Sequence, residues 1–333
     1  MHRLFWRPLS TAVAALAALA GALPAAAAPL VDRPILIAHR GASGYLPEHT
    51  MEAYRLAVSM GADFIEPDLF LTADGVAVAR HDRNLNATTN AGSVNIDSLS
   101  WAQVQALEAR SRGTTGYATP GGSPYYDGSE LFRVPSFVEV LDYVHGLYQD
   151  SGRIVGVYPE VKTISGNASY NLAIADAMLA ALNDPRYDGF FDGSRGNVFL
   201  QSFDQSVVQY LNTRTELPLV FLTSCPGTAA AAATVRSFAD GIGVSSAGAS
   251  QACIDRAHDA GLLVHVYTLT DVASQYELYY GRGVDGIFGN HPDVGVGVRD
   301  ALFPSTPVPE PASWALFAAG ATGLAAWRRR RAA

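Results

Sequence analysis

The stretch ILIAHRGASGYLPEHT, residues 35–50, begins as an apolar run and ends with several polar side chains. The run stops at His39-Arg40-Gly41, and a second histidine, His49, follows within the same stretch. A short and continuously apolar run is typical of a parallel strand that is covered on both faces. We therefore predict a buried strand over 34–38, with His39 and Arg40 at its carboxyl end.

Similar apolar runs recur along the chain and alternate with helical patterns. The predicted strands are 34–38, 63–69, 76–80, 154–161, 197–202, 217–222, 241–245, 262–268 and 285–289. The predicted helices are 50–60, 135–148, 168–183, 205–212, 250–260 and 272–280. This alternation indicates an α/β fold with a parallel sheet. About eight strands in about 270 residues favour a TIM (β/α)8 barrel, and no G-x-G-x-x-G follows the first strand, which disfavours a dinucleotide-binding fold.

Residues 84–134 interrupt this rhythm, because they are rich in Gly, Ser, Thr, Tyr and Asn. We interpret them as an insertion after the strand that ends at His81, projecting from the catalytic end of the barrel. A disordered excursion is the alternative. Four aromatic residues favour packing or ligand contact within the insertion: Tyr117, Tyr125, Tyr126 and Phe132.

The N-terminal segment has the composition of a secretory signal peptide. Arg3 and Arg7 precede an apolar Ala/Leu stretch and then small residues. Cleavage after Ala27 is expected, which makes residues 1–27 the signal peptide. A permanent membrane anchor is the alternative, but the apolar stretch is short for a membrane span.

The C-terminal segment, 307–333, contains Val308-Pro309-Glu310-Pro311, then a largely apolar stretch, then four arginines, 328–331. An apolar segment that ends in arginines is expected to stop in the membrane with those arginines on the cytoplasmic side. This end resembles the PEP-CTERM sorting signal of Gram-negative bacteria. The resemblance implies transient membrane anchoring, processing by an exosortase-type enzyme, and delivery to the periplasm, cell envelope or extracellular matrix. A plain tail anchor is the alternative, and either reading leaves 28–306 as the folded domain.

The charge of the folded domain argues against one class of partner. The chain has 23 basic and 31 acidic residues, and six of the arginines lie in the two terminal segments. The remaining domain is therefore strongly acidic, and this disfavours nucleic acid as a partner. Cys225 and Cys253 are the only cysteines, and in an exported protein one disulfide between them is plausible. Two free thiols are the alternative, and the lack of a C-x-x-C spacing disfavours metal ligation.

Polar residues gather where four of the predicted strands end. The four groups are His39-Arg40, Glu66 with Asp68, His81-Asp82, and Glu160 with Lys162. Glu66 and Asp68 are two residues apart in an extended chain, so their side chains point to the same face, and the same holds for Glu160 and Lys162. Carboxyl ends of barrel strands form a single face, so we expect these groups to meet there. Lys162 is the only lysine in the chain, and this also favours a functional position.

These residue types suit one chemistry. Three carboxylates, Glu66, Asp68 and Glu160, favour a hard cation, Ca²⁺ or Mg²⁺, over Zn²⁺. Arg40 and Lys162 supply fixed positive charge for a phosphoryl group. Histidines can exchange a proton near neutral pH, one as base and one as acid. A cation site, two fixed positive charges and two histidines together predict cleavage of a phosphodiester.

Five stretches resemble motifs of the glycerophosphodiester phosphodiesterase family, over residues 35–295. They are HRGASGYLPEHT, GADFIEPDLFLTADGVAVARHD, YPEVK, QSFD (201–204) and GLLVHVYTL (261–269). PEHT and YPE resemble the periplasmic branch in particular. The resemblance implies a TIM barrel with an insertion after the His81 strand, and substrates such as glycerophosphocholine and glycerophosphoethanolamine, cleaved to sn-glycerol 3-phosphate and an alcohol.

The resemblance also implies a role for each site residue. His39 and His81 would form the acid/base pair, Arg40 and Lys162 would hold phosphate, and Phe203 and Tyr267 would be walls of the glycerol pocket, with core packing as the alternative for both aromatic residues. The implied metal ligands are Glu66, Asp68 and Glu160. We interpret four neighbouring residues as structural: Glu48, His49, Thr50 and Asp82. Asp82 would orient His81, Thr50 would cap a helix, and Glu48 would pair with Arg40.

Two other functions are consistent with the same pattern. One is a lysophospholipase D or sphingomyelinase D-like activity on lipid phosphodiesters, which would need an apolar rim around the site. The other is a catalytically silent surface protein, suggested by the sorting tail. A silent protein would be expected to lose some of the seven polar site residues, and all seven are present.

Overall fold

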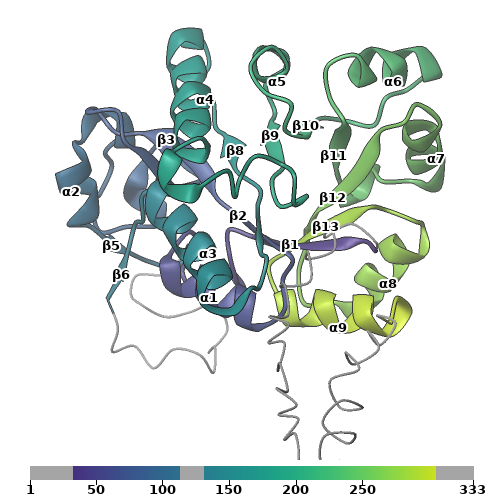
Figure 1. Ribbon diagram of the computed structural model, residues 1–333, viewed down its shortest axis with the longest axis horizontal. Coiled ribbons are helices and arrows are strands. Elements are labelled where there is room, and N and C mark those ends of the chain that lie inside the picture. The colour runs from purple at the N-terminus through teal and green to yellow at the C-terminus, as the bar shows by residue number, and fades with distance from the viewer. Residues whose placement is uncertain (1–32, 113–130, 305–333) are drawn as a thin grey trace, which may run out of the picture.

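The computed structural model describes residues 33–112 and 131–304 of the 333-residue chain. Within these ranges, eight strand positions form a closed parallel ring, with helices around its outside (Figure 1). β2 and β3 follow one another across Pro67 and share one position, as do β7 and β8 across Tyr158-Pro159. The ring closes because β2 pairs with β7 and β3 pairs with β8, while β1 lies between β2 and β13. The predicted TIM barrel is confirmed.

The elements have the following bounds. The ring consists of β1 (Ile35–His39), β2 (Phe64–Glu66), β3 (Asp68–Leu71), β7 (Gly156–Val157), β8 (Glu160–Val161), β9 (Leu200–Ser202), β10 (Leu219–Leu222), β11 (Gly241–Ser245), β12 (Leu263–Leu269) and β13 (Gly286–Gly289). The α-helices are α1 (Met51–Ser59), α2 (Trp101–Gln105), α3 (Phe137–Ser151), α4 (Ala168–Leu182), α5 (Gln205–Leu211), α6 (Ala229–Arg236), α7 (Gln251–Asp259), α8 (Ala273–Gly281) and α9 (Pro292–Leu302). Within the described ranges, none of the helices has the length and apolar character that a membrane span requires.

The inside of the barrel is filled by side chains. A cluster of buried residues from six of the eight strand positions occupies it: Ile35, Ile37, Phe64, Tyr158, Phe199, Val220 and Phe288. The interior is therefore a packed core, and a ligand can enter only at an end of the barrel.

Three aspartates fix the strands at the amino end of the barrel. Each of them directly precedes a strand, its backbone N–H donates to a carbonyl of the neighbouring strand, and its carboxylate accepts the N–H of that same residue. The pairs are Asp63 with Leu36, Asp240 with Leu219, and Asp285 with Val264. These two-point contacts set the register between β1 and β2, β10 and β11, and β12 and β13.

One predicted strand takes a different position in the fold. The segment 76–80 was expected to be a barrel strand, but β4 (Ala77–Ala79) runs antiparallel to β3 and lies outside the ring. The reason is a tight turn, in which Thr72 bonds to Asp74 and Val76, and Gly75 has a φ of +83°. His81 therefore reaches the carboxyl end of the barrel by a hairpin that folds back onto it, and not by a parallel strand.

The described parts of the insertion pack as an irregular layer beside this hairpin. They contain η1 (Leu85–Ala87), η2 (Ile96–Ser98), α2, and a short antiparallel pair of β5 (Glu108–Ala109) and β6 (Phe132–Arg133). Phe132 is buried in the core, in line with the packing expected of it. Tyr117, Tyr125 and Tyr126 lie outside the described residues.

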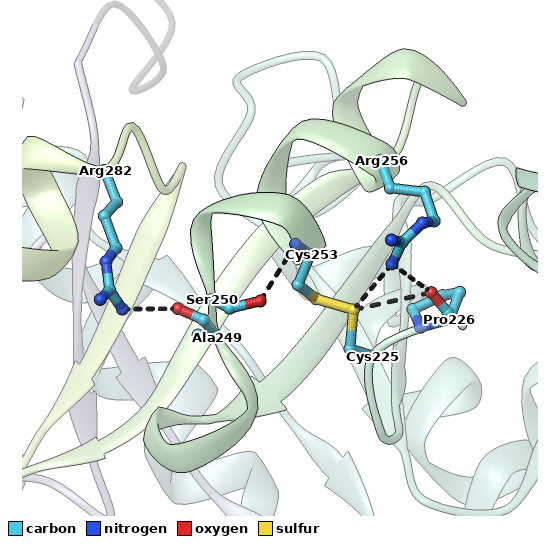
Figure 2. The surroundings of a disulfide bond; sticks show 7 residues. All are labelled: Cys225, Pro226, Ala249, Ser250, Cys253, Arg256 and Arg282. Atoms are coloured by element: carbon cyan, nitrogen blue, oxygen red, sulfur yellow. Dashed lines mark hydrogen bonds between the residues drawn. A yellow bond between two sulfur atoms is a disulfide. The ribbon is translucent and has the colours of Figure 1, made fainter. Parts of the chain in front are cut away.

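Cys225 and Cys253 form a disulfide, with Cα atoms 5.8 Å apart. The bond joins the loop after β10 to α7, and Figure 2 shows the side chain of Arg256 extending over that loop. Nη1 of Arg256 donates to the carbonyl of Pro226 at 2.8 Å. The disulfide that the sequence analysis considered plausible is thus present, and it lies on the side of the barrel formed by β10, β11 and β12.

Candidate active site

A cavity of about 200 Å³ lies at the carboxyl end of the barrel strands. Eight of the nine predicted site residues form its walls: His39, Arg40, Glu66, His81, Glu160, Lys162, Phe203 and Tyr267. The ninth, Asp68, is 1% exposed and pairs with Arg40 and Lys162 at the cavity wall. The fold therefore brings together the nine predicted site residues.

His39 is fixed at the end of β1 by an amide. Its Nδ1 lies 2.7 Å from Oδ1 of Asn290, and the same oxygen accepts the hydroxyl of Ser43 at 3.1 Å. Because an amide oxygen only accepts, Nδ1 of His39 carries the proton and Nε2 has the lone pair. Burial, and then the charge of Arg40, lower the pKa of His39 to about 3, so that the ring is neutral near pH 7.

His81 stands beside a carboxylate. Its Nδ1 lies 2.7 Å from Oδ1 of Asp82, which confirms the expectation that Asp82 orients it. Burial, and with it the charges of Lys162 and Arg40, lower the pKa of His81, while the charge of Asp68 and the bond to Asp82 act in the opposite direction. The two histidines thus differ, since His39 faces a neutral amide and His81 faces an anion.

Arg40 has an unusual backbone conformation that directs it to three acids. Its φ is +58°, in the left-handed region, and its N–H donates to Oε2 of Glu66 at 2.8 Å. Its side chain lies 3.2 Å from Glu48 and 3.5 Å from Asp68, so the expected pairing with Glu48 is confirmed. Gly41 permits this turn, because it has a φ of +83° and a Cβ there would come within 2.8 Å of the Ala53 backbone.

Three buried carboxylates share one corner of the cavity. Glu66, Asp68 and Glu160 are 2%, 1% and 6% exposed. Burial, and then the charge of Asp68, raise the pKa of Glu160 to about 8, and the same causes raise that of Glu66. Burial would also raise the pKa of Asp68, but Lys162, His49 and Arg40 hold it well below its usual value. Lys162 lies 2.8 Å from Glu160 and 3.4 Å from Asp68.

This corner fits a hard divalent cation. Oδ1 of Asp68 is buried and makes no hydrogen bond within the described residues, and the charge that faces it is Nζ of Lys162 at 3.4 Å. His49, Glu66 and Asp68 offer possible ligand atoms within 4.8 Å of one another. Nε2 of His49, however, lies 2.8 Å from Asp68, and a carboxylate can only accept, so this nitrogen carries a proton. His49 therefore orients Asp68, and the oxygen atoms are left as the donors.

His49 and Thr50 hold this arrangement from the start of α1. Nδ1 of His49 accepts the hydroxyl of Tyr54 across 2.8 Å, and the histidine is completely buried. Thr50 accepts the N–H of Ala53 at 3.2 Å and is the N-cap of α1, as expected. The structural interpretation of both residues agrees with these contacts.

Phe203 and Tyr267 form an aromatic wall of the cavity. Their rings meet edge to face with centroids 5.8 Å apart. Phe203 is 51% exposed, so core packing does not account for it. A large apolar ring held at the mouth of a polar cavity is suited to contact with ligand carbon atoms.

Three polar residues of the site were not predicted. Asn290 fixes His39, and Gln201 donates to Oε1 of Glu66 at 3.3 Å. Arg112 bonds to both Glu48 and Asp82. Gln201 lies within the QSFD stretch and Asn290 follows a predicted strand, so both had a positional signal. Arg112 lies in the Gly- and Ser-rich insertion and had none.

Comparison with known proteins agrees with this geometry. Residues 39–294 match the glycerophosphoryl diester phosphodiesterase family, and residues 307–331 match the PEP-CTERM protein-sorting motif. A glycerophosphodiester phosphodiesterase of Bacillus subtilis is 33% identical over 270 residues, which cover 79% of this chain and 85% of the relative. The sorting motif indicates an exported protein of a Gram-negative bacterium.

Two solved structures have the same fold. One is an Oleispira antarctica phosphodiesterase in complex with the product sn-glycerol-3-phosphate, with a TM-score of 0.63, 22% identity, and coverage of 80% of this chain and 97% of that one. The other is a glycerophosphodiester phosphodiesterase from Agrobacterium tumefaciens, with a TM-score of 0.57, 23% identity, and coverage of 79% and 99%. The family match spans most of the chain, and the prediction of an enzyme is confirmed. The chain belongs to the glycerophosphoryl diester phosphodiesterase family.

Proposed function

We propose that the chain hydrolyses glycerophosphodiesters, such as glycerophosphocholine and glycerophosphoethanolamine, to sn-glycerol 3-phosphate and an alcohol. The observation that carries this proposal is the one cavity in which two histidines, two fixed positive charges and a carboxylate cluster meet. The name of the Bacillus subtilis relative and the product bound to the Oleispira antarctica enzyme support the choice of substrate.

In this proposal the substrate is held at both of its halves. Arg40 and Lys162, at the cavity wall, attract the phosphoryl oxygens, and the planar guanidinium of Arg40 matches two of them. Phe203 and Tyr267 contact the carbon atoms of the glycerol group. The phosphorus atom is thereby placed between His39 and His81, which both belong to the cavity wall.

The two histidines divide the proton transfers according to their partners. His39 is neutral, with the lone pair on Nε2, so it acts as the base and takes a proton from the attacking water, whose oxygen joins the phosphorus. As the new P–O bond forms, the P–O bond to the headgroup breaks. His81, whose protonated form the neighbouring Asp82 stabilises, donates a proton to the departing alkoxide. Over the whole reaction one water is added across the phosphodiester.

The proposed ligands of a divalent cation are Glu66, Asp68 and Glu160, with Ca²⁺ or Mg²⁺ as the ion. Bound there, such a cation would offset the negative charge of the phosphoryl oxygens. His49 and Lys162 hold Asp68 and Glu160 in place for this role.

We also propose how the chain is processed. Residues 1–27 would be removed as a signal peptide and 307–333 by an exosortase-type enzyme, which leaves 28–306 as the mature enzyme. The match of 307–331 to the PEP-CTERM motif supports the second cleavage. The mature enzyme would act in the periplasm, the envelope or the extracellular matrix.

The test is the release of sn-glycerol 3-phosphate from glycerophosphoethanolamine and glycerophosphocholine by residues 28–306. The assay would contain Ca²⁺, Mg²⁺ or a chelator, with His39→Ala beside the unchanged enzyme. We expect release that needs a cation and falls about 10²- to 10⁴-fold in His39→Ala, the usual contribution of an acid or base. No release by a folded protein with either ion would contradict the proposal and would direct attention to lipid phosphodiesters.

A further inference from the structure

Arg112 uses its whole guanidinium fork on two acids of the site. Nε and Nη2 donate to the two carboxylate oxygens of Glu48 at 3.1 and 2.8 Å. Nη1 donates to Oδ2 of Asp82 at 2.7 Å. Each of these acids contacts a residue of the proposed mechanism, since Glu48 pairs with Arg40 and Asp82 pairs with His81.

The contact with Asp82 determines which oxygen faces His81. Arg112 takes Oδ2, so that Oδ1 is the oxygen 2.7 Å from Nδ1 of His81. Burial would raise the pKa of Asp82, but the bond to Arg112 is the larger of the opposing influences and keeps it below the usual value. Asp82 is thus held both ionised and in one orientation.

The contact with Glu48 acts on the phosphate-binding side. Glu48 is 7% exposed, and its two oxygens are shared between Arg112 and Arg40. Burial would raise the pKa of Glu48, but Arg112 and Arg40 hold it far below the usual value. The side chain of Arg112 is 42% exposed, so it is not a core residue whose main contribution is to packing.

Resting on the proposed function, we infer that Arg112 is a positioning residue that holds His81 through Asp82 and Arg40 through Glu48. It belongs to the insertion, at the point where the described residues 33–112 end. The insertion thereby supplies a part that the barrel strands lack, a single cation that bridges the proton-donating side and the phosphate-binding side. Lysine cannot replace it, because one ammonium group does not form a fork to Glu48 and a third bond to Asp82.

The test is steady-state kinetics of the whole mature chain with glycerophosphoethanolamine. We expect Arg112→Ala to lower kcat about 10- to 100-fold, the usual cost of losing a partner that orients a functional group. Arg112→Lys should recover less than half of this loss on a logarithmic scale. Guanidinium ion at low millimolar concentration should restore part of the activity of Arg112→Ala, because it can occupy the vacated position between the two acids. Arg133→Ala, in the same insertion and with a guanidinium that donates to the carbonyls of Ala106 and Leu107, is the matched control and should keep the kcat of the unchanged enzyme.

A double-mutant comparison separates positioning from simple anchoring of the segment. Because Arg112 acts through Asp82 as well as through Glu48, Arg112→Ala and Asp82→Asn together should lower kcat by clearly less than the product of the two single losses. Any of three results would overturn the inference. The losses of kcat in the two single variants could multiply in the double variant, Arg112→Ala could keep a kcat within twofold of the unchanged enzyme, or guanidinium could fail to rescue a folded Arg112→Ala protein. An inactive unchanged enzyme would overturn the proposed function as well, so the two failures are distinguishable.

Discussion

At the carboxyl end of the barrel, Glu66, Asp68 and Glu160 lie buried together, whereas at the amino end Asp63, whose side chain is 11% exposed, pairs with the buried Arg299 and more distantly with Arg33. The first group consists of like charges, and each carboxylate makes the ionisation of a neighbour harder. Asp63 instead accepts bonds from Arg299 and from the N–H of Leu36. Burial raises the pKa of Asp63 too, but its neighbours of opposite charge counteract the rise.

The comparison indicates that the charged groups at the amino end stabilise the fold, whereas the carboxylate cluster at the carboxyl end destabilises it. Buried like charges are destabilising, and they persist where function requires them. Buried opposite charges with satisfied hydrogen bonds maintain the register of the strands, and removing one partner is costly. In a TIM barrel this division is expected, because the carboxyl end carries the chemistry and the amino end carries stability.

The largest effect is expected from Glu66→Gln at the carboxyl end. Turnover should fall about 10³-fold, because Glu66 is both a proposed ligand of the cation and the acceptor of the Arg40 N–H. The free energy of unfolding in chelator at pH 8 should stay the same or increase. The pKa of Glu66 is raised in the folded state, so its ionised form costs stability above its unfolded pKa. Urea unfolding beside the activity assay checks both, and a clear loss of stability would contradict the contrast.

Arg299→Met, at the amino end, should have the reverse pattern. Asp63 would lose its buried partner, and the cation left beside it is the partly exposed Arg33, 3.9 Å away, so the change costs about 3 kcal/mol of unfolding free energy. At temperatures where the variant is folded, kcat should be unchanged, because Arg299 is on α9 and its bonds are to Asp63 and Asp300. Asp300→Asn is the control, since it changes the half-exposed partner of the same arginine and should cost less than about 1 kcal/mol.

Burial of His265 inside the barrel predicts that the protein loses stability at acidic pH. Burial lowers its pKa from 6.5 to about 4, although Asp285 acts in the opposite direction. The unfolded chain therefore takes up a proton below pH 6.5 while the folded chain does not, so the stability is complete above pH 6.5 and is lost as the pH falls towards 4. This one residue accounts for roughly 3 kcal/mol of that loss. The test compares urea unfolding of His265→Gln and the unchanged protein between pH 7 and pH 4, and equal slopes in the two would contradict it.

The sequence predicted the barrel and the members of the site because both follow from local patterns. Apolar runs identified the strands, and polar residues at strand ends identified the site. Three helices were missed: the short α2, which lies in the irregular insertion, and α9 and α6, which were missed for physical reasons. α9, PDVGVGVRDAL, contains glycine and valine, which are poor helix formers, and it is stabilised by the close packing of Gly295 against Leu36 and Tyr276. α6 begins with five alanines, which favour a helix but show no apolar periodicity.

What remained hidden depends on contacts between distant parts of the chain. The antiparallel direction of β4 follows from the turn at 72–75, and the apolar run of 76–80 alone does not reveal it. Arg112 lies 64 residues from Glu48 and 30 from Asp82, within a segment that has no regular pattern. A role defined by partners so far apart can be found only once the fold has brought them together.

The smallest effect concerns two phenylalanines on one segment, Phe199 and Phe203. Phe199 is 4% exposed and packs inside the barrel, whereas Phe203 is 51% exposed at the mouth of the cavity. Phe203→Ala should lower kcat/KM about tenfold, mainly through KM, because it removes ring contact with substrate carbon atoms worth about 1 to 2 kcal/mol. Its unfolding free energy should change by less than about 1 kcal/mol, while Phe199→Ala should cost about 3 to 5 kcal/mol. Equal losses of stability in the two variants would mean that Phe203 belongs to the core, and the aromatic wall would then have no part in substrate binding.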